Sequence, residues 1–196
     1  GDPIDGLPSY GDRSIHLWTN AVRVAPKAFD SEYVRAGCAF DRFEASEKTS
    51  KLPLYWNYNL NEAARFHSKD MSDNDHFSHD SSDGTPFQSR VARFYSGGYV
   101  GENIAVGYES PYVAVTQGWM CSPGHRANIM TPGYTEMGAG QENRYYTQNF
   151  GGRDGLPYHA IAMGIHWPEA PVESVSFFAD FHNQTGRPER FEVILN

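Results

Sequence analysis

Three short segments of the sequence hold histidine and glutamate side chains that could do chemistry: residues 76–79, 101–105 and 119–130. Imidazole serves both as a general base near neutral pH and as a metal ligand. A carboxylate can orient an imidazole or activate a water molecule. His79, His125 and Glu102 would together supply three ligands, and zinc takes three or four. We therefore predict these three residues as the candidate catalytic and metal-binding residues.

Each of these residues also has a plainer interpretation. A histidine in a loop often does no more than hold the loop by hydrogen bonds, and this applies to His79 and still more to His76. Glu102 could simply tie down the turn at Gly101. The charged form of His125 would be favoured near the C-terminal end of the helix that precedes it.

Two further patterns suggest chemistry but match no complete motif. Serines stand next to candidate histidines at Ser78 and Ser122, yet the chain lacks the Gly-x-Ser-x-Gly signature of a nucleophile elbow. Residues 80–84 are rich in oxygen ligands but lack the length and the distal glutamate of a calcium loop. We interpret residues 80–84 as a polar turn that leads into a helix cap at Thr85.

The elements that would position these residues change character along the chain. Apolar spacing and cap signals predict helices over 12–29, from Asn57 or Asn59 to 74, over 85–95 and over 110–121, with a turn or short helix over 125–130. We take Asp12 as a possible cap of the first helix. Short apolar runs then predict strands at 137–141, 145–150, 160–166, 174–182 and 191–195. Helices first and strands later indicate an α+β or three-layer fold.

Several of these segments, taken together, resemble a known family. The matching stretches lie, in order, at residues 64–71, 77–79, 101–105, 119–130 and 146–150. As a set they resemble the CAP superfamily, also described as the SCP/PR-1/Ag5-like domain, and its bacterial branch in particular. The resemblance extends over residues 12–151.

The resemblance implies a fold and a range of activities. The fold is a three-layer α-β-α sandwich with an antiparallel sheet and an open cleft, secreted and usually monomeric. Eukaryotic members carry two histidines and two glutamates in the cleft, where the histidines can bind zinc or another divalent metal. Activities proposed for the family include sterol or fatty-acid binding, antimicrobial action and proteolysis.

Only half of that set of four carries over to this chain. His79 matches the first histidine and Glu102 the glutamate of the Gly-Glu-Asn-Ile motif. Ser122 stands where the second glutamate is expected, and Tyr145 where the second histidine is expected. His125 is a candidate replacement for the missing histidine.

The resulting prediction is a CAP-like domain over residues 1–151 with a β-rich extension over 152–196. We expect a secreted, extracellular or cell-envelope protein whose cleft binds a metal ion or a small, peptidic or lipid ligand. The alternatives are a hydrolase that uses a metal-bound or Glu102-activated water, and a structural or adhesion domain with a vestigial cleft. The strand-like end at 191–196 leaves open a further domain beyond it.

Composition removes some classes of partner. The formal net charge is −8 with 16 Lys+Arg, and these cations form no run along the chain. Nucleic acids and anionic membrane surfaces both attract clustered cations, so neither is expected as a partner. No apolar stretch approaches the roughly 20 residues of a membrane span. The chain opens without a basic and apolar leader, which is either absent or already removed.

The two cysteines, Cys38 and Cys121, allow two interpretations. They are either two buried thiols or one disulfide, which would suit an exported protein. A Cys38–Cys121 bond would close a long loop, worth roughly 4–5 kcal/mol in the chain-entropy treatment.

Overall fold

The computed structural model of the chain describes residues 8–35, 38–156, 161–162 and 179–180. The chain divides into two compact units, Gly1–Asp154 and Gly155–Asn196. The helices of the first unit are α1 (Tyr10–Val24), η1 (Pro26–Phe29), α2 (Asp30–Arg35), η2 (Phe40–Arg42), α3 (Tyr58–Asn74), α4 (Phe87–Ala92), α5 (Pro111–Val113), η3 (Ala114–Trp119, a π-helical turn) and α6 (Pro123–Met130). Its strands are β1 (Tyr55–Trp56), β2 (Val100–Val106), β3 (Glu136–Glu142) and β4 (Tyr145–Gly151).

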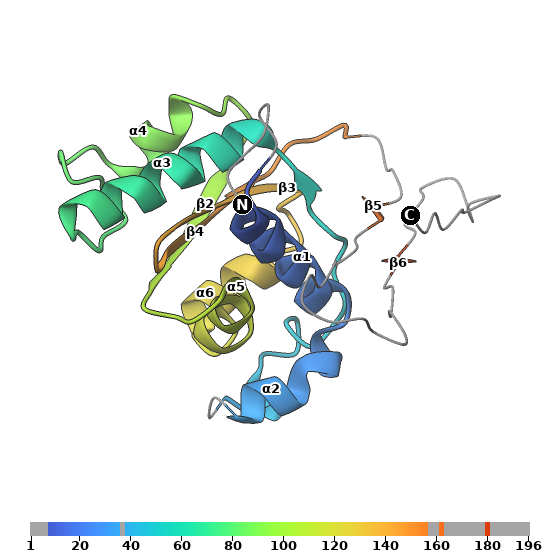
Figure 1. Ribbon diagram of the computed structural model, residues 1–196. Coiled ribbons are helices and arrows are strands. Elements are labelled where there is room, and N and C mark those ends of the chain that lie inside the picture. Colours follow the sequence, from blue (N-terminus) through green and yellow to red (C-terminus); the bar gives the residue numbers. More distant parts are fainter. Residues whose placement is uncertain (1–7, 36–37, 157–160, 163–178, 181–196) are drawn as a thin grey trace, which may run out of the picture. The chain divides into compact units, whose positions relative to one another are not determined.

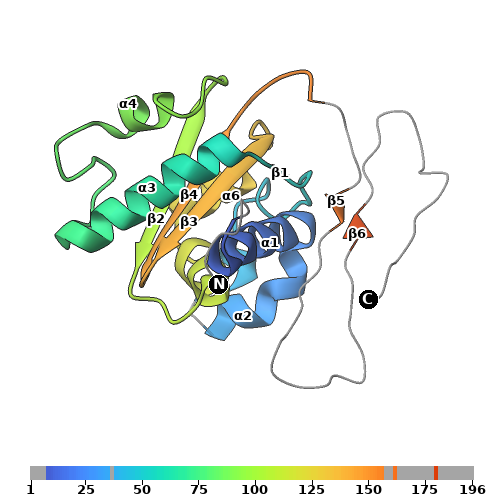
Figure 2. The same cartoon turned by 45° about the horizontal axis from the view of Figure 1, so that its top comes forward.

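These four strands form one sheet in the order β1-β3-β4-β2. Only the short β1 pairs parallel to its neighbour, while β3 with β4 and β4 with β2 pair antiparallel. Helix α3 lies along one side of the sheet, and α1, α5 and α6 lie on the other (Figures 1 and 2). This arrangement confirms the predicted α+β fold with helices on both sides of an antiparallel sheet.

Helix α3 sits directly on the sheet because two glycines of β3 leave room for its backbone. A Cβ atom on Gly138 would overlap the backbone of Asn61, and one on Gly140 would overlap the backbone of Ala64. Polar bonds then fix the helix in place, since the Asn61 amide donates to the Ala139 carbonyl at 2.6 Å. The sequence of β3 therefore determines how deeply α3 is seated.

The opposite face of the sheet carries the larger apolar core. Its fully buried side chains include Ile15 of α1, Met137 of β3 and Phe150 of β4. Trp119 is 1% exposed, and its indole N–H donates to the Ile104 carbonyl at 3.0 Å. Trp119 thus joins η3 to β2 within this core.

Two of the predicted helix caps are confirmed. The Asn57 side chain accepts from the Leu60 N–H at 3.1 Å at the start of α3, as predicted. Ser110 caps the helix that begins at Pro111 by accepting from the Val113 N–H at 3.3 Å. Both caps satisfy backbone donors that a helix cannot pair internally.

Two other predicted caps are wrong by a few residues. Helix α1 is capped by Ser9, while Asp12 is the third helical residue and completes a capping box by accepting from the Ser9 N–H. Helix α4 begins after Pro86, not at Thr85, and its first N–H, on Phe87, donates to Asp80 at 3.3 Å. A carboxylate from the preceding loop thus takes the place of the local cap, and no sequence spacing signals this.

The predicted strands fall into two groups. Those at 137–141 and 145–150 are confirmed as β3 and β4. In the second unit, β5 (Ile161–Ala162) pairs antiparallel with β6 (Ala179–Asp180), inside the strands predicted at 160–166 and 174–182. The rest of those two strands, and the one at 191–195, lie outside the described residues.

Cys38 and Cys121 form a disulfide across 83 positions of sequence, so the disulfide interpretation is confirmed. The bond joins the segment after α2 to the end of η3. Among the helices that the structure describes, none has the length and apolar character needed to cross a membrane.

Candidate functional site

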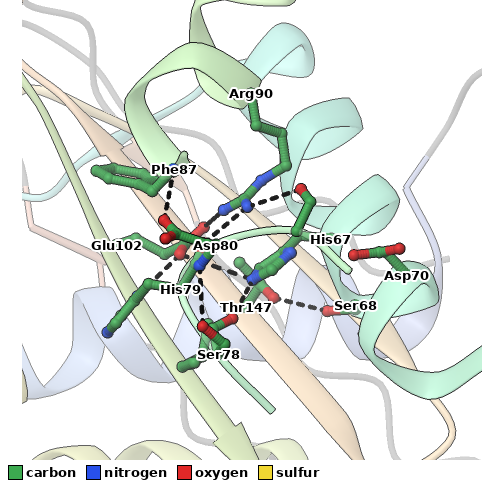
Figure 3. A network of polar contacts seen from close by, with 12 residues as sticks. His67, Ser68, Asp70, Ser78, His79, Asp80, Phe87, Arg90, Glu102 and Thr147 are labelled. Atoms are coloured by element: carbon green, nitrogen blue, oxygen red, sulfur yellow. Dashed lines mark hydrogen bonds and ion pairs between the residues drawn. The ribbon is translucent and has the colours of Figure 1, made fainter. Parts of the chain in front are cut away.

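The candidate site is built around Glu102 on β2, which is an edge strand of the sheet. The register pairs Glu102 with Asn149 of β4, which in turn pairs with Gly138 of β3. Directly paired residues point to the same face of a sheet, so Glu102 and Asn149 both face α3. Figure 3 shows the polar network that gathers here from α3, α4, β2 and the loop between the helices.

The Glu102 carboxylate is buried and saturated with donors, its side chain being 1% exposed. One oxygen accepts from the His79 ring Nδ1 at 2.9 Å. The other accepts from the Arg90 guanidinium at 2.5 Å and from the Asn149 side-chain nitrogen at 2.9 Å, with the amide oriented to satisfy both its atoms. Arg90 is itself fully buried, so its charge balances that of Glu102 in a place that water does not reach.

His79 is the exposed member of this network, with 52% of its side chain accessible. Because a carboxylate only accepts hydrogen bonds, the bond to Glu102 places the ring proton on Nδ1. The other ring nitrogen, Nε2, points away from the network (Figure 3). The bond to Glu102 raises the pKa of His79, an effect that burial partly opposes.

The loop that carries His79 is fastened to both neighbouring helices. The His67 ring on α3 lies 2.9 Å from the Ser78 carbonyl, and Arg90 of α4 donates to the His79 carbonyl at 2.8 Å. Further along, Asp70 of α3 accepts from the Ser82 N–H at 2.8 Å. The position of His79 is therefore set by two helices rather than by the loop alone.

His125 reaches the same region from α6, on the other side of the sheet. Its carbonyl accepts from the Asn103 side chain at 3.1 Å, and Asn128 donates to the Glu102 carbonyl at 3.2 Å. The Nδ1 atom of His125 is buried without a hydrogen-bond partner among the described residues. Burial, and then the nearby charge of His79, lower the pKa of His125.

The structure brings some of the predicted site residues together and leaves His76 apart. His79 and Glu102 are in direct contact, and His125 lies near enough for the charge of His79 to act on it. His76 is separate, because its ring bonds the Asp80 carbonyl at 3.1 Å and so pins its own loop.

The hydrogen-bond donors around Glu102 decide whether this carboxylate can bind a metal ion together with His79 and His125. In the parts of the chain that the structure describes, no three histidine, cysteine, aspartate or glutamate groups are arranged to hold one metal ion. Glu102 does not fit as a ligand, because His79, Arg90 and Asn149 occupy both its oxygens. The imidazoles of His79 and His125 are the groups left that zinc could use, so zinc binding stays a prediction.

The positions that depart from the family pattern take other roles. Tyr145 donates its hydroxyl proton to Asp75 at 2.9 Å, next to the C-terminal end of α3. Ser122 directly precedes α6 without a capping bond from its side chain. In the loop over 80–84, Asp83 accepts from the Thr85 N–H at 2.8 Å, in accord with a polar turn.

Three members of the network, His67, Arg90 and Asn149, are not identifiable as site residues from the sequence. His67 lies in the matching stretch over 64–71, but it also stands on the apolar face of its helix. Arg90 lies within the helix predicted over 85–95, and Asn149 is the variable position of the stretch over 146–150. For Arg90, the available signal was that a buried glutamate needs a cation, but nothing in the spacing identifies which one.

Comparison with protein families identifies the class to which this fold and site belong. Residues 18–151 match the family described as CAP, the cysteine-rich secretory protein family. The match extends over more than half of the chain and includes β2, the His79 loop and α6. The chain therefore belongs to the CAP family, as its motifs indicated.

Three of the proteins similar to this chain come from bacilli. The chain is 39% identical over 102 residues to the uncharacterized membrane protein YlbC of Bacillus subtilis (strain 168), covering 50% of this chain and 28% of the relative. It is 35% identical over 138 residues to the uncharacterized protein YkwD of the same organism, covering 69% and 52%. The crystal structure of an extracellular protein containing a SCP domain from Bacillus anthracis str. Ames aligns with a TM-score of 0.54 and 27% identity, covering 78% and 45%. The chain thus spans at most about half the length of these relatives.

Proposed function

We propose that this chain is an extracellular binding domain whose ligand contacts the outward ring nitrogen of His79. The observation that carries the proposal is the contrast within one hydrogen-bonded pair. Glu102 is 1% exposed while His79 is 52% exposed, and 2.9 Å separates the carboxylate from Nδ1. A buried carboxylate that fixes the tautomer and direction of an exposed imidazole is typical of a ring that is held ready to contact something else.

The chemistry of the ligand follows from the state of that nitrogen. With the proton on Nδ1, the neutral ring offers a lone pair on Nε2, which can accept from a hydroxyl or amide or can bind a metal ion. The His125 ring, which lies near enough for the charge of His79 to lower its pKa, is a second candidate contact for the same ligand. These groups suit a divalent metal ion or the polar part of a small, peptidic or lipid ligand.

The hydrolase alternative in which Glu102 itself activates water is less well supported. A general base must reach the proton that it removes. Both oxygens of Glu102 are already engaged, and its side chain is almost completely buried.

An extracellular location is supported by the Bacillus anthracis relative and by the disulfide, because such bonds persist in oxidising compartments.

The test is a titration of the histidine-labelled protein followed by NMR, with three probes in turn: zinc chloride, palmitate and a peptide digest of casein. We expect one probe to shift the ring signals of His79 and His125 and to leave His76 unchanged. His79→Gln should abolish the shift of the His125 ring signals. His76→Gln, on the same loop, should leave the shifts of both His79 and His125 unchanged. Analysis of the casein peptides by mass spectrometry reports any cleavage. If no probe moves the His79 signals at millimolar concentration, the proposal is contradicted.

A further inference from the structure

We propose that His67 is a positioning residue that holds the His79 loop in the conformation required for the bond between His79 and Glu102. This inference rests on the proposed function for its purpose but not for its geometry. His67 is fully buried on α3 and belongs to the network in Figure 3.

The hydrogen bonding of His67 is limited to one partner in the described structure. Its Nε2 lies 2.9 Å from the Ser78 carbonyl, which can only accept, so the ring proton is on Nε2. Its Nδ1 is buried without a partner among the residues described, and the distance from Nε2 to the nearer Glu102 oxygen is 3.8 Å, beyond a hydrogen bond. The one polar role of this buried ring is therefore to hold the carbonyl of the residue before His79.

The electrostatic setting agrees with a neutral ring. Burial lowers the pKa of His67, and the charge of Arg90 acts in the same direction, although Glu102 opposes both. A neutral donor can bind the Ser78 carbonyl without placing a second cation beside Arg90. The pair of bonds to successive carbonyls, from His67 to Ser78 and from Arg90 to His79, fixes the peptide unit between them.

Two substitutions separate positioning from simple filling of space. His67→Gln keeps an amide donor at about the reach of Nε2, whereas His67→Leu removes the donor and keeps an apolar side chain. The readout is the rate at which the His79 ring N–H exchanges with solvent in the ligand-free protein, measured by NMR with ¹⁵N-labelled histidine. Loss of one hydrogen bond is worth about 1 kcal/mol. We therefore expect His67→Leu to speed this exchange about fivefold, and His67→Gln to restore a rate within about twofold of the wild type.

The outcomes distinguish this inference from the proposed function. A wild-type exchange rate in a folded His67→Leu variant, or a failure of His67→Gln to restore the rate, overturns the positioning role. If His67→Leu does not fold, His67→Asn replaces it, because its shorter amide falls short of Ser78. Since no ligand is present, none of these results depends on whether the metal, lipid or peptide probes bind. Conversely, unresponsive probes would overturn the proposed function and leave the exchange result intact.

Discussion

At the scale of single residues, the site depends on a buried charge that is balanced by one cation. Glu102 and Arg90 are both inaccessible to water, and each would be costly to bury alone. Arg90 also holds the His79 carbonyl, so the same side chain neutralises the carboxylate and anchors the loop. Stability and function are therefore coupled at Arg90.

Replacing Arg90 by methionine should destabilise the protein strongly, because it leaves Glu102 buried without its cation. Breaking a buried pair in this way costs about 3–5 kcal/mol. Urea unfolding at pH 7 measures the loss. Arg93→Met is the matched control, since Arg93 is an exposed residue just after α4 that lies over the Phe66 ring at 5.3 Å, a contact worth less than about 1 kcal/mol. Equal effects of the two substitutions would contradict the assigned role of Arg90.

A second residue-scale prediction concerns acid stability and His16 of α1. Burial lowers the pKa of His16 from 6.5 to about 4. The unfolded chain therefore takes up a proton before the folded chain does, so this stability is present above pH 6.5 and is lost as the pH falls towards 4. The loss is at most about 3 kcal/mol.

His16→Gln tests this prediction because glutamine can still donate to the Leu54 carbonyl, which lies 2.8 Å from the His16 ring, but does not titrate. Unfolding free energies at pH 7 and pH 4.5 should differ less in the variant than in the wild type, by about 2 kcal/mol. A variant that loses as much stability as the wild type on acidification would rule His16 out as the cause.

The sequence predicted the residues of the site unevenly. His79 and Glu102 were identifiable because their motifs have a fixed order, and the structure brings them into contact. Arg90 and Asn149 were not identifiable, because their roles arise only when α4 and β4 are brought beside β2. Contacts between distant segments of a chain leave no periodic signal in the sequence.

At the scale of elements, the close contact of α3 with the sheet is what places His67 and the His79 loop near Glu102. Gly138 permits this contact, since any side chain there would collide with the backbone at Leu60 and Asn61. The loops and caps were predicted less well than the helices. Local rules place a cap next to its helix, whereas α4 uses Asp80, seven residues before the N–H that it binds.

Gly138→Ala should therefore destabilise the protein by about 1–3 kcal/mol, since overpacking forces backbone shifts. Thermal or urea unfolding measures the change. Gly124→Ala in α6 is the control, because a Cβ there meets no atom within 4 Å and alanine favours helix. It should be neutral or stabilising by up to about 1 kcal/mol. Similar losses in both variants would show that α3 is not packed as described.

At the scale of the whole molecule, the Cys38–Cys121 bond closes most of the first unit into one loop. Removing it as Cys38→Ser/Cys121→Ser should lower the unfolding free energy by about 4–5 kcal/mol, mainly by freeing the unfolded chain. Urea unfolding of the two proteins measures this difference. Thiol titration of the denatured wild type provides the check, and two free thiols would refute the bond.

The share of each relative that this chain covers limits what those relatives can say about its function. It covers 28% and 52% of the two Bacillus subtilis proteins, so their remaining parts have no counterpart in the aligned region. They align with this chain over 102 and 138 residues. The proposed binding role therefore rests on the geometry of this chain's own CAP domain.

The central claim is that buried Glu102 orients exposed His79 so that Nε2 faces outward. The most direct measurement is the tautomer of His79 in the ligand-free wild-type protein, read from the ¹⁵N signals of its ring above its raised pKa. The structure predicts a proton on Nδ1 and a lone pair on Nε2. A ring protonated on Nε2, or one that averages between the two tautomers, would contradict the bond to Glu102 and the binding role built on it.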